Sequence, residues 1–363
     1  MRVLLAGGGS AGHTSPLLAT AEALRRAVPD ISITCLGTER GLETRVIPAA
    51  GYRLELIPPV PLPRALSVEL VKTPRRLLAA ATATRDVLAR VDPDVVVGFG
   101  GYVSMPAYLA AHRAKLPLVV HEGNARPGIA NRFGARVCTH LVATSFPETR
   151  LAHARFIGLP IRRSISTLQR CEMRPLARAH FGLDQERPTL LVTGGSQGAR
   201  RINDSMAAAA AALAAAGIQV LHITGPNATV TLPPEIGAAG AAPYVAVPFV
   251  DAMELAYAAA DAMVGRAGAN SVTEAGCVGL PAVFVPLPIG NGEQVLNARA
   301  VREAGGAIVV EDAAFTPAWA ARELTALLTD PARLKRMGIA AARPIRRDAD
   351  VALAQMILGA VTS

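Results

Sequence analysis

Short apolar runs alternate along this 363-residue chain with longer stretches in which apolar residues recur at helical spacing. The short runs end in glycine, proline or polar residues and predict buried strands, while the longer stretches predict helices. Because strands and helices alternate from end to end, the pattern predicts an α/β fold with parallel sheets. The predicted strands cover residues 3–6, 31–36, 54–57, 94–99, 118–122, 141–143, 189–193, 220–224, 244–247, 262–264 and 281–286. The clearest predicted helices cover residues 16–28, 64–91, 269–278, 317–328, 331–337 and 349–360.

Three glycine-rich turns that follow predicted strands stand out. They read GGGSAGH at 7–13, GFGGY at 98–102 and GGSQGAR at 194–200. The first and third share one order: apolar strand, paired glycines, serine, glycine, helix. Two such openings in one chain predict two Rossmann-like halves. We place the domains at residues 1–160 and 161–340, followed by a helical segment, 341–363, that can cross back to the first domain.

A strand that ends in a glycine turn and leads into a helix presents backbone N–H groups to an anion. In the first turn, Gly7, Gly9 and Gly12 also fit the spacing GxGxxG of dinucleotide-binding proteins. Glu39, at the end of the second strand, could bind the ribose of such a cofactor. These residues alone leave a nicotinamide-dependent dehydrogenase open.

The segment 264–297 combines three features of a nucleotide-sugar site. A glycine turn at 265–268 opens the predicted helix 269–278 and offers N–H groups to a phosphate. Glu274 lies one turn inside that helix and could bind sugar hydroxyls, and Gln294 lies in the loop past the next strand. Both positions are at carboxyl ends of strands, where ligands bind in such sheets. An ordinary βαβ unit with a capped helix would show the same local pattern.

The positive charge is concentrated in the first half. Residues 1–158 hold 19 basic and 11 acidic side chains, whereas residues 159–363 hold 18 and 17. Such an excess favours phosphates, nucleic acid or an acidic membrane as partner. Aromatic residues make up only 4% of the chain, which argues against nucleic acid. The predicted helix 64–91 places Arg64, Lys72, Arg75 and Arg76 among leucines, so it either rests on an anionic bilayer or forms ordinary surface helices.

No cysteine or carboxylate pattern in the sequence indicates a metal site. The four cysteines are scattered without a CxxC pair, which suits reduced thiols in the cytosol. Asp92-Pro93-Asp94 has the form DxD but precedes a strand, at the wrong end for a site, and we interpret it as a turn. We therefore expect no metal site and no cofactor, and activity that survives EDTA.

Seven motifs together resemble one family from nearly end to end. They are GGGSAGH, GFGGY, HEGN at 121–124, GLPIR at 158–162, GGSQGAR, the segment 265–281 and GNGEQ at 290–294. The chain resembles the MurG family, UDP-N-acetylglucosamine:lipid I N-acetylglucosaminyltransferases. The resemblance implies a GT-B fold, in which two Rossmann-like domains with parallel sheets face each other across a cleft. It also implies an acceptor- and membrane-binding first domain and a UDP-sugar-binding second domain.

The implied reaction is an inverting transfer of N-acetylglucosamine from UDP-N-acetylglucosamine to the muramyl 4-hydroxyl of lipid I. The acceptor is a polyprenyl-diphosphate-linked muramyl peptide, and the product, lipid II, serves peptidoglycan synthesis. The implied location is the cytoplasmic face of the bacterial plasma membrane, with the protein held peripherally on the anionic inner surface. Such a transfer needs a base for the hydroxyl proton and charge stabilisation for the leaving diphosphate. Helix N-terminal amides and arginine would supply the latter.

The resemblance assigns roles to single residues through the motifs that carry it. His13 matches the family's active-site histidine and is the titratable residue best placed as base, with Glu122 as the alternative. Asn124 matches an acceptor-side asparagine, and Glu274 and Gln294 match residues that bind the ribose and the sugar of the donor. The other matched substrate-binding positions are Ser10, Ala11 and Gly12 in the first loop, Arg162 and Ser196 on the donor, Val250 at the uracil, and Ala269, Asn270, Ser271, Val272 and Thr273 at the helix start.

Other interpretations remain open at this point. The first loop often reads GGTGGH in the family, and Ser10-Ala11 replace Thr-Gly here, which restricts the backbone slightly. A different GT-B enzyme acting on UDP-sugars, such as a glycolipid synthase or an epimerase, would use similar loops. A nicotinamide-dependent dehydrogenase is a further alternative, and a non-catalytic protein that binds nucleotide-sugars or lipids is another.

Overall fold

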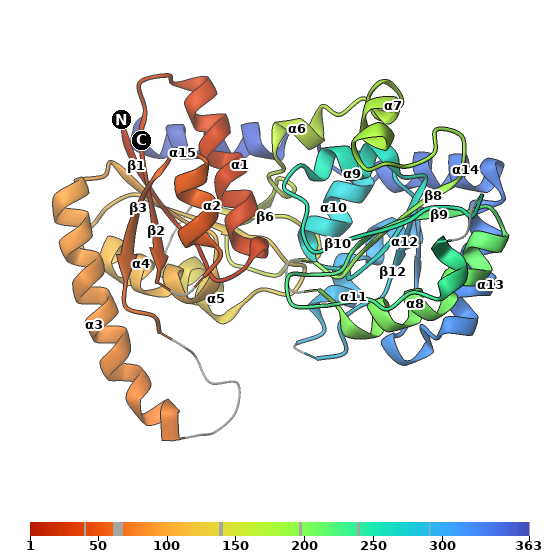
Figure 1. The fold of residues 1–363 in the computed structure, drawn as a ribbon. Coiled ribbons are helices and arrows are strands. Elements are labelled where there is room, and N and C mark those ends of the chain that lie inside the picture. Colours follow the sequence, from red (N-terminus) through yellow and green to blue (C-terminus); the bar gives the residue numbers. More distant parts are fainter. Residues whose placement is uncertain are drawn as a thin grey trace. The chain divides into compact units, whose positions relative to one another are not determined.

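The computed structural model describes residues 1–39, 41–60, 68–137, 141–195, 198–237, 240–289 and 291–362. Its contacts divide the chain into two compact units. The first unit holds Met1–Arg162 and Arg346–Ser363, and the second holds Arg163–Ile345. Each unit contains one parallel sheet with helices packed against it, which confirms the predicted α/β class (Figure 1). Within the described ranges, no helix combines the length and the apolar character that crossing a membrane requires.

The sheet of the first unit is parallel throughout. Its strands are β1 (Arg2–Ala6), β2 (Ser32–Thr38), β3 (Arg53–Ile57), β4 (Val95–Gly98), β5 (Leu118–Glu122), β6 (Val142–Thr144) and β7 (Ala154–Phe156). They lie in the order β3-β2-β1-β4-β5-β6-β7. The order reverses between β1 and β4, so the loops after these two strands meet at the switch point where open parallel sheets bind ligands.

Helices cover both faces of this sheet. They are α1 (Ala11–Ala27), α2 (Glu43–Ala49), α3 (Val68–Val91), α4 (Gly101–Arg113), α5 (Ile129–Val137) and α15 (Ala349–Thr362). Alternate residues of β1 point to opposite faces. Val3 and Leu5 pack in one core with Leu353 of α15, whereas Leu4 packs in the other core with α3, α4 and α5. The C-terminal helix α15 thus packs beside α1 on the first sheet.

The second unit repeats this plan with six strands. They are β8 (Thr189–Thr193), β9 (Gln219–Ile223), β10 (Tyr244–Val247), β11 (Ala262–Gly265), β12 (Ala282–Phe284) and β13 (Ala307–Val309). The order is β10-β9-β8-β11-β12-β13, with the switch between β8 and β11. The helices are α6 (Arg163–Ser166), α7 (Arg170–His180), α8 (Arg200–Ala215), α9 (Met253–Ala259), α10 (Ala269–Cys277), α11 (Glu293–Asn297), α12 (Arg299–Glu303), α13 (Pro317–Leu328) and α14 (Pro331–Ala342), with short 3-10 turns η1 (Pro234–Gly237) and η2 (Asp312–Ala314).

The structure differs from the prediction at the start of α1 and at an edge strand of the second sheet. Helix α1 begins at Ala11 and not at residue 16, so His13 lies in its first turn. Pro16 is tolerated inside α1 because its missing N–H deprives only one carbonyl, that of Gly12, of a helical partner. Helix α3 is described from Val68 onward, and residues 64–67 of the predicted helix lie outside the described residues. The edge strand β13 is too short for its apolar pattern to predict it.

Three arginines at four-residue spacing on α7 tie this helix to the second sheet. Arg170 donates from Nε to the carbonyl of Tyr257 at 3.1 Å and from Nη1 to that of Gly279 at 3.2 Å. Arg178 is almost completely buried and donates to the carbonyl of Ala259 at 3.2 Å. These carbonyls lie at the C-terminal ends of α9 and α10, where positive charge is favourable. Burial lowers the pKa of Arg170 to about 10, so it stays charged at neutral pH.

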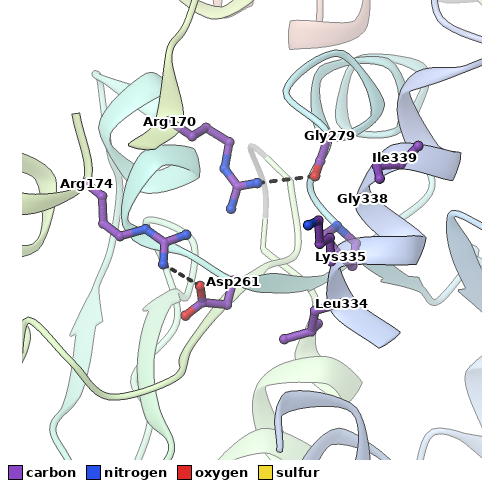
Figure 2. Close-up of a pocket in the computed structure, with 9 residues that line it drawn as sticks. Arg170, Arg174, Asp261, Gly279, Leu334, Lys335, Gly338 and Ile339 are labelled. Carbon is purple, nitrogen blue, oxygen red and sulfur yellow. Dashed lines mark hydrogen bonds and ion pairs between the residues drawn. The ribbon is translucent and has the colours of Figure 1, made fainter. Parts of the chain in front are cut away.

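Asp261 completes this arginine cluster. Its two carboxylate oxygens bind Arg174 at 2.8 Å and Arg178 at 2.9 Å. Figure 2 shows Arg174 directed at Asp261, and Arg170 at Gly279, around a cavity of about 410 Å³. Asp261 directly precedes β11, so the cavity lies at the amino ends of the strands. The switch-point loops lie at the opposite, carboxyl ends, and the cavity is therefore not the candidate site.

Candidate active site

His13 lies where the carboxyl ends of β1 and β4 meet. Its Nδ1 atom is 2.8 Å from the backbone carbonyl oxygen of Phe99, in the loop after β4. A carbonyl oxygen can only accept a hydrogen bond, so Nδ1 carries the proton of the neutral ring. Nε2 is then unprotonated and can take a proton from a substrate hydroxyl. The side chain is partly exposed, as a base that meets substrate must be.

Two glycines after β4 leave the space that the His13 ring occupies. Gly100 and Gly101 have φ angles of 89° and 77°, which glycine adopts without strain. A Cβ atom on Gly100 would lie 3.1 Å from Cε1 of His13, and one on Gly101 would lie 2.8 Å from the carbonyl oxygen of Gly8. The turn GFGGY therefore allows the loop after β4 to support both the histidine and the first glycine loop.

Glu122 ends β5, and its buried carboxylate organises the loop that follows. Oε1 accepts a hydrogen bond from the backbone N–H of Asn124 at 2.8 Å. Oε2 accepts from the backbone N–H of Gly128 at 2.9 Å and from the side-chain amide of Asn131 at 3.0 Å. Asn131 in turn accepts from the hydroxyl of Tyr108 at 2.6 Å. Both oxygens of Glu122 are thus engaged in holding the chain from 124 to 131.

The first glycine loop and the loop after β5 lie side by side. Ser10 is the N-terminal cap residue of α1, and its carbonyl accepts the backbone N–H of His13 at 3.1 Å. A Cβ atom on Gly123 would lie 3.7 Å from the carbonyl oxygen of Gly12. Asn124 is the next residue of that second loop. The structure therefore brings the predicted substrate-binding positions of the first loop next to the loop that carries Asn124.

The first loop is not arranged like a dinucleotide-binding loop. Such a loop directs its N–H groups at a pyrophosphate. Here the N–H of Gly9, the second glycine of the GxGxxG spacing, donates to the carboxylate of Glu43 at 2.7 Å. A carboxylate of the chain itself holds this donor and would repel a pyrophosphate. Glu39, the residue considered for ribose binding, is exposed.

In the second unit, α10 starts at the carboxyl end of β11, next to the switch point. Its cap residue Gly268 has an extended conformation, with φ −63° and ψ 150°. The carbonyl of Gly268 accepts the first helical hydrogen bond, from Val272 at 3.0 Å. The backbone N–H groups of Ala269 and Ser271 precede this bond, in the turn whose N–H groups have no acceptor within a helix. This is the geometry with which helices bind phosphate.

Glu274 is oriented by a residue that no motif indicates. Its Oε2 accepts a hydrogen bond from the hydroxyl of Tyr257 at 2.7 Å. Tyr257 belongs to α9 and is buried, and its backbone carbonyl is bound by Arg170. The carboxylate of Glu274 therefore points in a direction set by packed elements.

Gln294 lies at the same edge of the second sheet, in the first turn of α11. Its Oε1 accepts the backbone N–H of Leu287 at 3.0 Å. The bond leaves the NH₂ group as the donor of this side chain, the polarity that a sugar hydroxyl oxygen requires. Asn297, buried in the same helix, donates to the carbonyl of Ala267 at 3.3 Å. Helix α11 is thus tied to the turn that opens α10.

Three predicted positions stand apart from these contacts. Val250 follows β10 and is half-buried. Arg162 is the last residue of the segment Met1–Arg162 of the first unit. Its Nε is buried without a hydrogen-bond partner among the described residues. Ser196 lies outside the described residues.

Arg266 is a further polar anchor of the second unit. It lies in the turn after β11, and Nη1 donates to the carbonyl of Val285 at 3.0 Å. The same nitrogen binds Asp312 at 2.6 Å, and Asp312 also binds Arg201 of α8 at 2.8 Å. Arg266 therefore links the ends of β11 and β12 to η2 at the carboxyl edge of the sheet.

Comparison with known proteins identifies the family. Residues 3–143 match the glycosyltransferase family 28 N-terminal domain, and residues 189–353 match the glycosyltransferase family 28 C-terminal domain. A relative from Nocardioides sp. strain JS614 is 62% identical over 358 residues, which cover 99% of this chain and 98% of the relative. It is named UDP-N-acetylglucosamine–N-acetylmuramyl-(pentapeptide) pyrophosphoryl-undecaprenol N-acetylglucosamine transferase. The chain belongs to the MurG family.

Further MurG relatives and solved structures agree with this result. A Streptomyces coelicolor protein of the same name is 54% identical over 363 residues, covering 100% of this chain and 99% of the relative. The crystal structure of Acinetobacter baumannii MurG aligns with a TM-score of 0.74 at 26% identity, covering 99% of each chain. The calicheamicin glycosyltransferase, at 19% identity and a TM-score of 0.62, shows only that the GT-B fold is shared. The protein is a glycosyltransferase, as the sequence resemblance implies.

Metal-ligating residues do not gather in the part of this MurG-family chain that the structure describes. Among the described residues, no group of three or more His, Cys, Asp or Glu side chains could hold a metal ion. Asp94 instead accepts the backbone N–H of Arg2 at 2.7 Å, and Asp92 pairs with the Arg2 guanidinium at 2.9 Å. The DxD sequence thus binds the start of β1, at the amino edge of the first sheet.

Among the described residues, each unit completely buries one histidine. Burial lowers the pKa of His121 on β5 and of His222 on β9 to about 4. The Nδ1 atom of His222 is 2.8 Å from the hydroxyl of Tyr244, and its Nε2 is 3.0 Å from Oδ1 of Asn203. The Nε2 of His121 is 3.1 Å from the hydroxyl of Ser145. Both sites therefore favour the neutral ring.

We expect the free energy of unfolding to fall as the pH drops from about 6.5 towards 4. A histidine of the unfolded chain titrates near pH 6.5 and takes up a proton that the folded site excludes. Above pH 6.5 the ring is neutral in both states, and the folded protein keeps its full stability. Between pH 6.5 and 4, protonation of the unfolded chain lowers the free energy of unfolding by up to about 3 kcal/mol for each histidine. Urea unfolding at pH 7 and 4.5 measures the effect. His222→Gln should flatten the dependence and the exposed His112→Gln should not; equal acid sensitivity of all three proteins would contradict this assignment.

Proposed function

We propose that the enzyme transfers N-acetylglucosamine from UDP-N-acetylglucosamine to the muramyl 4-hydroxyl of lipid I, with inversion, to form lipid II for peptidoglycan synthesis. The observation that carries the proposal is the 62% identity, over nearly the whole chain, to an enzyme named for transfer to that class of acceptor. The loop geometry supports it, because a histidine with a free Nε2 and a helix N-terminus lie at the two switch points.

In the proposed reaction, Nε2 of His13 takes the proton of the acceptor hydroxyl. The hydroxyl oxygen attacks the anomeric carbon from the face opposite UDP, and the bond from that carbon to the diphosphate oxygen breaks. The leaving oxygen receives the electron pair, and N–H groups at the start of α10, with Arg162, stabilise its charge. Glu122 is better suited to shaping the acceptor loop with Asn124 than to accepting a proton, because donors engage both of its oxygens.

Donor recognition in this proposal belongs to the second unit. Glu274 accepts the ribose hydroxyls, and the NH₂ group of Gln294 binds the sugar. The backbone at Val250 contacts the uracil. The remaining proposed donor contacts are Ser196, Ala269, Asn270, Ser271, Val272 and Thr273, and those of the acceptor are Ser10, Ala11 and Gly12.

A coupled UDP-release assay with a soluble lipid I analogue tests the proposed function. The expected product is the acceptor extended by one β-linked N-acetylglucosamine, identified by mass and by the anomeric proton in NMR, at a rate unchanged by EDTA. UDP release with diacylglycerol but not with the muramyl acceptor would indicate a glycolipid synthase instead. Formation of an epimeric UDP-sugar without an acceptor would indicate an epimerase.

Glu274→Ala should weaken UDP binding by about 1.5–3 kcal/mol, because charged hydrogen bonds to the ribose are lost. Tyr257→Phe should cost less, about 0.5–1.5 kcal/mol, since it removes only the hydrogen bond that orients the carboxylate. Titration calorimetry with UDP measures both effects. Glu303→Ala, an exposed glutamate of the same unit, is the control. Wild-type affinity in Glu274→Ala would rule out the ribose contact.

We also propose that the first unit attaches peripherally to the anionic cytoplasmic face of the plasma membrane, where a polyprenyl acceptor resides. Most of the net positive charge lies in its sequence. On α3, Arg75 is exposed and Leu78 exposes 58% of its surface, so cation and apolar side chain are both presented to solvent. Arg64, Leu66 and the side chain of Lys72 lie outside the described residues.

Reversing two charges on α3, Arg75→Glu with Arg76→Glu, should weaken binding to anionic vesicles at least about tenfold, because each cation near such a surface contributes about 1 kcal/mol. Added salt should weaken the wild type as well. Vesicle sedimentation gives the affinity, and calorimetry should show unchanged UDP binding. The same charge change on unit two, Arg302→Glu with Arg336→Glu, is the matched control. If both double variants lost vesicle binding equally, α3 would not be the contact.

A further inference from the structure

A buried carboxylate lies directly beneath the first glycine loop. Glu43, the first residue of α2, is 0% exposed. Its Oε2 accepts the backbone N–H of Gly9 at 2.7 Å. Its Oε1 accepts the backbone N–H of Thr38 at 3.1 Å and the hydroxyl of the same residue at 3.0 Å. No cationic side chain among the described residues pairs with it.

Three separate glycines make room for this side chain. A Cβ atom on Gly8, Gly37 or Gly41 would lie well inside van der Waals contact of the Glu43 side chain. Gly8 belongs to the first loop, Gly37 to β2 and Gly41 to the turn before α2. Burying a carboxylate without a cation is unfavourable unless strong hydrogen bonds compensate it. The cost of burying this charge indicates that the loop geometry it imposes has a role.

The carboxylate binds the backbone N–H of Gly9, one residue before Ser10, the cap residue of the helix α1 that carries His13. Gly9 has a φ of 90°. A Cβ atom built on Gly9 would have no heavy atom within 4 Å, so packing does not hold this residue in place. Its hydrogen bond to Glu43 therefore fixes the course of the loop into Ser10. The carbonyl of Ser10 then accepts the N–H of His13 at 3.1 Å. A continuous path of bonds leads from Glu43 to the histidine.

We propose that Glu43 is a positioning residue for the transfer: its charge sets the first glycine loop and, through it, the direction of Nε2 of His13. This inference rests on the proposed role of His13 as base. Glu43 itself touches no substrate. The charge is needed because the N–H groups of Gly9 and Thr38 bind different oxygens, and a carboxylate accepts at both. An amide has one acceptor oxygen, so one of the two N–H groups would face an NH₂ group.

Glu43→Gln tests this with almost no change of shape. We expect kcat to fall about 10–100-fold while the donor KM stays within twofold. Gly8→Ala presses a Cβ against the same carboxylate from the loop side and should act in the same direction, so it serves if Glu43→Gln folds poorly. The control is Asp350→Asn. This change breaks the ion pair between another buried carboxylate of this unit and Arg26, which are 2.6 Å apart at the far end of α1. It should lower stability and leave kcat unchanged.

Two further measurements separate this proposal from the proposed function. In a His13→Ala background, Glu43→Gln should cause no additional loss of kcat, because it acts through His13. Imidazole ¹⁵N NMR without substrate should show the Nδ1–H tautomer in the wild type and a mixture in Glu43→Gln. An unchanged tautomer with an unchanged kcat would overturn the positioning role. A wild type inactive on the muramyl acceptor would overturn the proposed function, and the NMR comparison would still decide the role of Glu43.

Discussion

Replacing His13 with alanine should lower kcat by roughly 10²–10⁴-fold while the affinity for UDP-N-acetylglucosamine changes little. The size follows from the loss of a positioned base in the step that takes the hydroxyl proton. Donor affinity should persist because the proposed donor contacts belong to the second unit. The hydrogen bond from Nδ1 to the carbonyl of Phe99 makes the prediction specific, since it leaves Nε2 as the nitrogen that can accept the proton.

The test compares three variants in steady-state UDP release. His13→Gln can keep a hydrogen bond to the carbonyl of Phe99 without providing a base, so it should be as slow as His13→Ala. His112→Ala, at the exposed end of α4, is the control and should retain full rate. If His13→Gln turned over normally, the side chain would serve the loop and not the proton. If both His13 variants were normal, the base would have to be another group, with Glu122 next to be tested.

The architecture could be read from the sequence because its determinants are local. Apolar runs such as 3–6 and 189–193 end in glycine turns, and two such openings predict two Rossmann-like units. The observed sheets have their switch points at these turns. The residues at which helices begin and end were harder to predict, because they depend on hydrogen bonds that the hydrophobic pattern does not show. Helix α1 starts at Ala11 since the carbonyl of Ser10 accepts the N–H of Thr14 at 3.1 Å, the first helical hydrogen bond.

The polar contacts of the candidate site could not be read in the same way, because they join residues far apart in the chain. His13 is 86 residues from Phe99, whose contribution is a backbone carbonyl and leaves no trace in side-chain chemistry. Tyr257, which orients Glu274, sits in an alanine-rich helix without a motif. The dinucleotide spacing rule pointed to Glu39, whereas the buried carboxylate at the loop is Glu43. The glycines beside Glu43 indicate that its side chain is buried there only once the fold is known, because they come from separate parts of the sequence.

Replacing Arg178 with methionine should lower the free energy of unfolding of the second unit by about 3–5 kcal/mol, a large share of the stability of a typical domain. Methionine fills similar space but leaves the carbonyls of Ala259 and Gln185 without their donor and takes one cation from Asp261. Exchanging Asp261 for asparagine in the same chain should recover part of the loss, because less uncompensated charge then remains buried.

Urea unfolding followed by circular dichroism measures this change. Arg322→Met on α13 is the matched control, since its ion pair with Glu323 is exposed and should contribute less than about 1 kcal/mol. The first unit should unfold at an unchanged midpoint, because the arginine cluster of α7 bonds only to residues of the second unit in the described part of the chain. A loss below about 1 kcal/mol in Arg178→Met would mean that water replaces the guanidinium, and that the cluster does not hold α7 against the ends of α9 and α10.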